Sequence, residues 1–183
     1  MLIVGVGGTL RPGSSTERAL FHVMRQVEAL GAKTSLFVGE SINLPMYIPH
    51  QSTPCAGARS LITALRQASA IVIGSPGYHG GISGLVKNAL DYTEDMSKDA
   101  APYFEGRAVG CIATGAGWQG ANATLNALRN TVHALRGWPT PLGIALNTRE
   151  PLFGVDGECL FPDVAELTRV MAAQLVSFAE RFG

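Results

Sequence analysis

The chain has 183 residues, which suits one domain with a sizeable core, and its 14 Lys and Arg balance its 14 Asp and Glu. It therefore lacks the basic excess of a nucleic-acid-binding protein, and no apolar run approaches the roughly 20 residues that span a bilayer. Because the first residues read as a strand rather than a secretory signal, we expect a cytoplasmic protein without nucleic-acid or membrane partners. Only 15% of the residues are charged, a composition that favours a homo-oligomer.

Cysteine and histidine do not point to a disulfide framework or a metal. The three cysteines are scattered, and the four histidines lack the spacing of metal ligands. Cys111 lies in the apolar run AVGCIATG and is expected to be a buried small hydrophobe. We therefore expect no metal site.

Taken in chain order, five apolar runs alternate with five amphipathic helical patterns. The runs, which predict strands, are Leu2–Val6, Thr34–Val38, Ala70–Gly74, Ala108–Ala113 and Leu142–Asn147. Most are continuous, which is typical of strands covered on both faces. The helical stripes lie at 19–27, 58–65, 82–90, 121–135 and 164–182. We predict one α/β domain over residues 1–183, a doubly wound three-layer sandwich with five parallel strands and helices on both faces.

Three glycine-rich loops follow predicted strands and lead into predicted helices: Gly7–Ser14, Ser75–Gly81 and Thr114–Gly120. In open α/β sheets, ligands bind beyond the carboxyl ends of the strands. The three loops are therefore the expected place of a binding site.

The first loop suggests an anion but misses two common phosphate patterns. Gly8 and Gly13 have the separation of a Walker A loop, yet Ser14 stands where its lysine should be. Leu10 takes the place of the third glycine in a dinucleotide fingerprint. Neither pattern is satisfied.

What remains is a cradle of hydroxyl groups, one positive charge and free backbone N–H groups at the start of a helix. Its side chains are those of Thr9, Arg11, Ser14, Ser15 and Thr16. Such a set suits a terminal phosphate monoester, whose three oxygens need many donors. One alternative stays open: Ser14 and Glu17 have the spacing of a capping box, which would make the stretch structural.

The second and third loops carry enough glycine for the backbone to approach a flat ligand and bind its edge. Each also brings an aromatic side chain, Tyr78 or Trp118. Each of these aromatic side chains is compatible with a ligand contact or with a subunit interface. His79 is compatible with a ligand contact or with an ordinary surface position.

Together the three loops resemble those of the NAD(P)H-dependent FMN reductase family, flavoproteins with the flavodoxin-like fold. The most specific stretch is SPGYHGGISGLVKNALDY, which is similar to the family's Ser-Pro-Glu-Tyr-Asn-Gly-Ser followed by Lys-Asn-Ala-Leu-Asp. The first loop is similar to the family's Gly-Ser-x-Arg-x-x-Ser phosphate loop, and the third to its glycine-rich loop beside the isoalloxazine. The resemblance covers essentially the whole chain and implies the strand order 2-1-3-4-5, with homodimers or homotetramers.

The resemblance also implies residue roles. The FMN phosphate would be held by Thr9, Arg11, Ser14, Ser15 and Thr16. The flavin ring and the ribityl chain would be lined by Pro76, Gly77, Tyr78, His79, Gly80 and Gly81. The other side of the ring would be bordered by Thr114, Gly115 and Gly117. Three residues depart from the family pattern: Gly77 replaces a glutamate, His79 an asparagine and Gly81 a serine. These departures bear on the second substrate, because backbone atoms do much of the work of holding FMN.

The implied activity is a flavin-dependent oxidoreductase with FMN as cofactor and NADPH or NADH as donor. Hydride would pass from nicotinamide C4 to flavin N5, and a small acceptor would then follow in the same place, with no catalytic acid or base required from the protein. A second flavin, a quinone, an azo dye or a metal oxyanion would suit as acceptor. The rival functions are a flavodoxin-like electron carrier, which would have a strongly acidic surface, and a non-enzymatic flavin-binding module.

Overall fold

The five predicted apolar runs all form strands in the computed structural model, which describes residues 1–49, 55–154 and 156–182. The strands are β1 (Leu2–Gly7), β2 (Lys33–Val38), β3 (Ala70–Tyr78), β5 (Ala108–Gly115) and β7 (Ile144–Asn147). They pair in parallel in the order β2-β1-β3-β5, with β7 on the outer edge of β5. The predicted order 2-1-3-4-5 is therefore confirmed for these strands.

Two further short strands were not predicted. β6 (Trp138–Pro139) pairs with the first half of β5, ahead of β7 on the same edge, so the edge strand is interrupted. The interruption includes Pro141, which has no N–H group to donate to a ladder. The other short strand, β4 (Gly81–Ile82), runs antiparallel to the end of β3.

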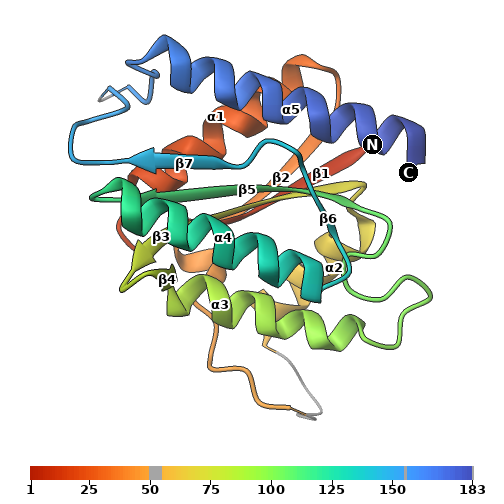
Figure 1. Cartoon of the computed structure of the whole chain (residues 1–183). Helices are drawn as coiled ribbons and strands as arrows, with labels where there is room; N and C mark the ends of the chain where they lie inside the picture. Colours follow the sequence, from red (N-terminus) through yellow and green to blue (C-terminus); the bar gives the residue numbers. More distant parts are fainter. Residues whose placement is uncertain (50–54, 155, 183) are drawn as a thin grey trace.

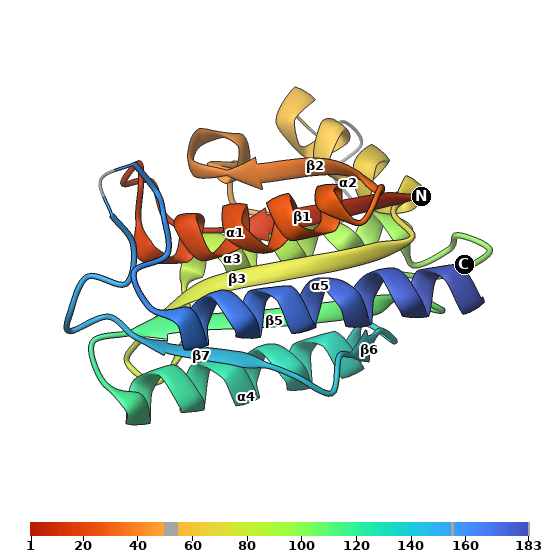
Figure 2. The same ribbon diagram turned by 90° about the horizontal axis from the view of Figure 1, so that it is seen from above.

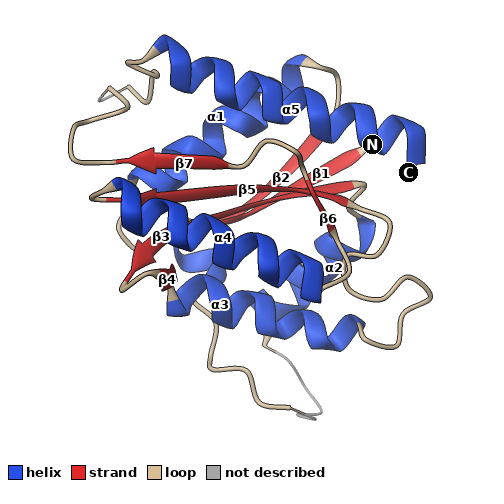
Figure 3. Ribbon diagram, in the orientation of Figure 1, coloured by secondary structure: helices blue, strands red, loops and turns tan. Residues whose placement is uncertain are grey.

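Helices cover both faces of the sheet, as Figure 1 and Figure 3 show. The α-helices are α1 (Ser15–Ala29), α2 (Ala56–Gln67), α3 (Gly84–Asp91), α4 (Trp118–Ala134) and α5 (Pro162–Phe182), and the short 3₁₀ helices are η1 (Gly39–Ile42) and η2 (Tyr92–Met96). α1 and α5 lie on one face, and Figure 2 shows them side by side. The remaining α-helices lie on the opposite face (Figure 1).

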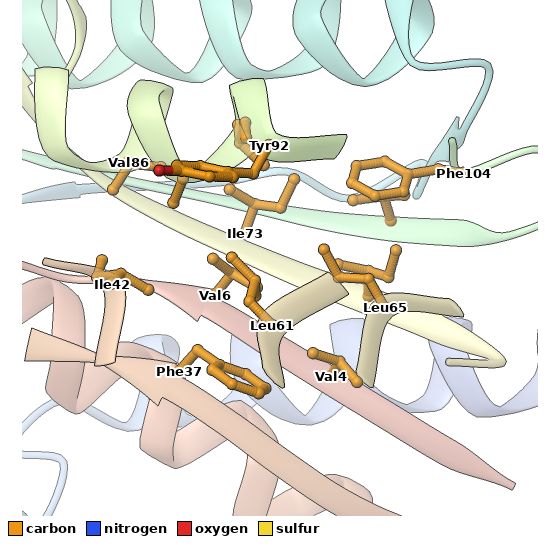
Figure 4. Packing of buried hydrophobic residues seen from close by; sticks show 14 of the residues in the cluster. Val4, Val6, Phe37, Ile42, Leu61, Leu65, Ile73, Val86, Tyr92 and Phe104 are labelled. Carbon is orange, nitrogen blue, oxygen red and sulfur yellow. The ribbon is translucent and has the colours of Figure 1, made fainter. Parts of the chain in front are cut away.

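Each face of the sheet carries its own hydrophobic core, because neighbouring side chains of a strand point to opposite faces. Ile3 and Val72 pack with α1 and α5. Val4 and Ile73, from the same two strands, pack with the helices of the other face, as Figure 4 shows. This double coverage explains why the strands read as continuous apolar runs. Cys111 is fully buried as predicted, and burial raises the pKa of its thiol to about 12.

The carboxyl ends of the strands meet at one edge of the sheet, opposite the chain termini (Figure 1). Among the described residues, none of the helices has the length and apolar character of a membrane span, and no three or more His, Cys, Asp and Glu side chains are grouped so that they could hold a metal ion. The edge with the carboxyl ends is where the three glycine-rich loops emerge.

Candidate flavin site

One pocket of about 300 Å³ joins the three predicted loops. Ten predicted residues line it: Thr9, Arg11, Ser14, Ser15, Thr16, Pro76, Gly77, Tyr78, Thr114 and Gly115. Two more lining residues, Ala116 and Thr148, were not predicted. Thr148 directly follows β7, and this place after a strand is the one feature of the sequence that could have indicated it. Among the residues that the structure describes, no carboxylate, histidine, lysine or cysteine lines this pocket.

The capping box and the pocket lining coexist in the first loop. Ser14 caps α1, since its Oγ accepts a hydrogen bond from the Glu17 N–H at 3.3 Å. The Glu17 carboxylate in turn accepts from the Gly13 N–H at 3.0 Å, one residue before the usual position of a capping box. The Ser14 hydroxyl only accepts in this cap, so its own proton stays available to a ligand.

Donors for an anion gather at the start of α1. The N–H groups of Ser15 and Thr16 lie in the first helical turn, where no acceptor exists within the helix. Arg11 is exposed and forms no ion pair with any residue that the structure describes. Thr9 differs, because its hydroxyl group donates to the Arg11 carbonyl and accepts from the Arg11 N–H, both at 3.1 Å. Thr9 therefore shapes the loop that presents Arg11.

The second loop is a tight hairpin rather than an open loop. Tyr78 pairs with Gly81 across β3 and β4, and the two residues between them, His79 and Gly80, have φ angles of 53° and 81°. Positive φ at both central positions defines a type I′ turn, for which Asn-Gly is the preferred sequence. His79 therefore occupies a turn position for which asparagine, the residue of the family pattern, is also well suited.

The hairpin tip lies outside the pocket lining. His79, Gly80 and Gly81 were expected to line the flavin ring, but none of them lines the pocket. The turn carries the chain away from the pocket at Tyr78 and returns it to α3. The structure therefore does not place these three residues at the site.

Gly77 is required by protein packing. A Cβ at this position would lie 2.6 Å from Thr124 Oγ1 and 3.2 Å from the carbonyl oxygen of Gly120, both on α4. The close approach of α4 leaves no room for a side chain in this direction. It therefore explains why glycine replaces the glutamate of the family pattern at this position.

The third loop is held by the segment that follows β7. The Thr148 N–H donates to the Gly115 carbonyl at 2.8 Å, and Arg149 Nε donates to the Ala116 carbonyl at 2.9 Å. Gly117 begins α4 with extended backbone and does not line the pocket, contrary to expectation. No motif indicates Arg149, and its place after the last strand is the only sequence feature connected with the site.

A larger hollow, of about 470 Å³, lies along α5 and includes Val170, Phe178 and Phe182. It is mostly apolar and lies away from the carboxyl ends of the strands. The smaller pocket is therefore the candidate site, because it alone combines the strand-end position with anion donors and glycine-rich walls.

The fold and the pocket together define a flavodoxin-like α/β protein with a phosphate-type loop after its first strand. Its donors suit the FMN phosphate, and its narrow backbone walls suit a flat ring. The model of the family described as NADPH-dependent FMN reductase matches residues 1–150, and the chain belongs to this family. The predictions of an NAD(P)H-dependent flavin oxidoreductase and of FMN as cofactor are confirmed.

Known proteins are similar over much or all of the chain. An NADPH azoreductase from Bacillus sp. (strain OY1-2) is 24% identical over 98% of this chain and 96% of its own length. The FMN-dependent NADPH-azoreductase of Staphylococcus aureus (strain USA300) is 33% identical over 61% of this chain and 56% of its own length. The fold of FerB, a flavoenzyme NAD(P)H:(acceptor) oxidoreductase from Paracoccus denitrificans, matches with a TM-score of 0.79 at 17% identity, over 100% of this chain and 98% of FerB.

Proposed function

We propose that this chain is an FMN-binding reductase that passes electrons from NADPH or NADH to a small organic acceptor. The observation that supports this best is the single pocket in which the three predicted loops meet. When bound, FMN supplies the redox chemistry by taking hydride from the dinucleotide and later reducing the acceptor. The chain's own residues bind the cofactor, orient it and leave it accessible.

In this proposal the FMN phosphate lies against the first turn of α1. The N–H groups of Ser15 and Thr16 and the buried hydroxyl group of Ser14 donate to its oxygens, and Arg11 supplies positive charge. The positive end of the helix dipole favours the same charge. Thr9 contributes by holding the Arg11 backbone in place.

The flavin ring would be held between the Pro76–Tyr78 and Thr114–Ala116 segments, both of which line the pocket. Tyr78 is 57% exposed, so a second planar molecule can reach this side of the site. Of the described residues that line the pocket, only Arg11 and Tyr78 have ionisable side chains. A site without a carboxylate or histidine suits hydride transfer, which needs no protein acid or base, better than hydrolysis.

The acceptor follows the oxidised dinucleotide into the same place. Because two similar proteins are named azoreductases, an azo compound is the first acceptor class to test. A quinone, a second flavin and a metal oxyanion are the further candidates.

We also propose that the chain forms a homodimer or homotetramer. Leu10 and Tyr78 are both strongly exposed, and with Leu85 they line a further hollow of about 200 Å³ beside the flavin pocket. Exposed apolar side chains at a site rim suit contact with a second subunit. Sedimentation velocity tests this directly, and a monomer at micromolar concentration would contradict it.

The test of the function is a visible spectrum of the purified protein with and without added FMN. We expect a flavin absorption band at about 450 nm. The band should bleach when NADPH or NADH is added in the absence of air, and it should return when an acceptor is added. The electron carrier and the non-enzymatic module instead predict bound flavin that neither dinucleotide reduces. Gel filtration of the mixture then shows whether FMN stays bound or dissociates as a substrate would.

A further inference from the structure

Arg149 lies at the rim of the candidate flavin pocket, and only part of its guanidinium group forms hydrogen bonds with the described residues. Its Nε donates to the carbonyl of Ala116, a lining residue, and its backbone N–H donates to Asn147 Oδ1 at 3.2 Å. The backbone and the start of the side chain are therefore both anchored.

The charge of Arg149 is not neutralised by a neighbour. Among the described residues no carboxylate forms an ion pair with it, including the adjacent and exposed Glu150. Its two terminal nitrogens, Nη1 and Nη2, have no hydrogen-bond partner in the described part of the chain. Two N–H groups in one plane match two oxygens of a phosphate or a sulfonate.

An exposed aromatic residue follows the carbonyl group that Arg149 holds. Trp118, two residues beyond Ala116, is 60% exposed at the start of α4. An indole ring offers a stacking surface for a planar group, and a guanidinium group anchored two residues away along the chain offers a charge. Gly117 gives α4 no side-chain cap, so the positive end of this helix adds to the local potential.

We propose that Arg149 and Trp118 form a subsite at the pocket rim for a planar aromatic group that carries a phosphate or a sulfonate. The inference rests on the proposed function, because the molecule that brings this group is the one that reacts with bound FMN. Two molecules have the required chemistry. One is NADPH, through the 2′-phosphate of its adenosine, and the other is a sulfonated aromatic acceptor.

The test compares matched pairs of probes on FMN-loaded protein by calorimetry. Adenosine 2′,5′-bisphosphate is paired with adenosine 5′-monophosphate, and naphthalene-2-sulfonate with 2-naphthol, so that each pair differs by one anionic group. The variants are Arg149→Gln, which removes the charge, Arg149→Lys, which keeps the charge without the planar fork, and Trp118→Ala. Arg181→Gln near the end of α5, at the opposite edge of the sheet, is the control with the same loss of charge.

We expect Arg149→Gln to weaken the binding of the anionic probe of at least one pair by about 10-fold or more and to leave its neutral or singly phosphorylated partner unchanged. The affinity of Arg149→Lys for the anionic probe should lie between those of wild type and Arg149→Gln. Trp118→Ala should weaken the binding of both members of the pair. A loss confined to the bisphosphate identifies the dinucleotide as the source of the group, and a loss confined to the sulfonate identifies the acceptor.

Two results would overturn the inference: unchanged binding of both anionic probes, or an equal loss for both members of each pair, which would make Arg149 a brace for the third loop. The affinity of each variant for FMN itself is measured alongside, and the probes are titrated with the FMN site saturated. If the wild-type protein binds no FMN, the proposed function fails first. If it binds FMN and is reduced by NADPH while Arg149→Gln behaves as wild type, only the present inference fails.

Discussion

The hydroxyl groups of Thr16 and Thr114 lie 2.6 Å apart in the protein interior, although 98 positions separate them in the chain. Thr16 lies in the first turn of α1 and Thr114 near the end of β5, and both are almost fully buried and line the flavin pocket. One hydroxyl donates to the other, so the first and third loops are joined directly. The walls of the site are therefore set before any ligand binds.

Replacing Thr114 by Val should lower the free energy of unfolding by about 1–2 kcal/mol, because it leaves the buried Thr16 hydroxyl group unpaired. Replacing both Thr16 and Thr114 by Val removes both hydrogen-bonding groups. The loss in the free energy of unfolding should then be smaller than the sum of the losses in the two single variants. Urea unfolding of the FMN-free protein measures this. Thr148→Val is the control, because Thr148 is a half-buried pocket residue whose side chain forms no hydrogen bond with any residue that the structure describes. Strictly additive costs would contradict the coupling.

Replacing Arg11 by Ala should weaken FMN binding by about 10- to 100-fold, since a charge-assisted contact to the phosphate is lost. Riboflavin has the same ring but no phosphate, so its affinity should not change. Fluorescence titration of both flavins against wild type and variant separates the two contributions. Equal losses for FMN and riboflavin would place Arg11 at the ring instead.

Replacing Gly77 by Ala should destabilise the protein by about 1–3 kcal/mol, because the new Cβ would overlap Thr124 and the Gly120 carbonyl. Gly81→Ala is the matched control: no atom lies within 4 Å of its Cβ position, and its φ is not in the left-handed region. Thermal unfolding of the two variants side by side gives the comparison. A Gly77→Ala variant as stable as Gly81→Ala would refute the packing explanation.

His79 should tolerate Asn but not a β-branched residue. Val at this left-handed position costs about 1–2 kcal/mol, whereas Asn is a preferred residue of the type I′ turn. Both variants should bind FMN like wild type, because His79 does not line the pocket. Unfolding measurements and FMN titrations of both variants test these two statements. Weaker FMN binding by the Asn variant would show that His79 contacts the flavin after all.

The ion pair between Arg66 and Asp99 should make a small, pH-dependent contribution to stability. The hydrogen bond from Arg66 Nε to Asp99, 2.8 Å long, holds the pKa of Asp99 below its ordinary value of 3.8. A carboxylate with a lowered pKa stabilises the fold above its unfolded-state pKa and loses this effect as the pH falls through its folded-state pKa.

Asp99→Asn should therefore lower the free energy of unfolding at pH 7 by no more than about 1 kcal/mol, since the pair is partly exposed. The difference from wild type should start to shrink as the pH falls towards 4 and disappear at lower pH. Urea unfolding at pH 7, 4 and 2.5 measures the trend. A difference that grows with acidity would show that the charge pair is not its cause.

The sequence determined the layers of this protein and the edge of the sheet that carries the site. Short continuous apolar runs are typical of strands buried on both faces, and their alternation with amphipathic stripes leaves a parallel sheet as the simplest arrangement. The order of strands and helices along the chain follows from local residue patterns, and so does the helix cap at Ser14. For this reason the loops after β1, β3 and β5 could be singled out in advance.

Only the tertiary structure decided which residues of those loops reach the pocket. A glycine reads the same in sequence whether a ligand or a helix fills the space beside it, and α4 fills it at Gly77. His79 and Gly80 look like binding residues until the hairpin pairing of β3 and β4 places them in its turn. Thr148 and Arg149 reach the site through the pairing of β7 with β5, a contact between distant segments that no local pattern encodes.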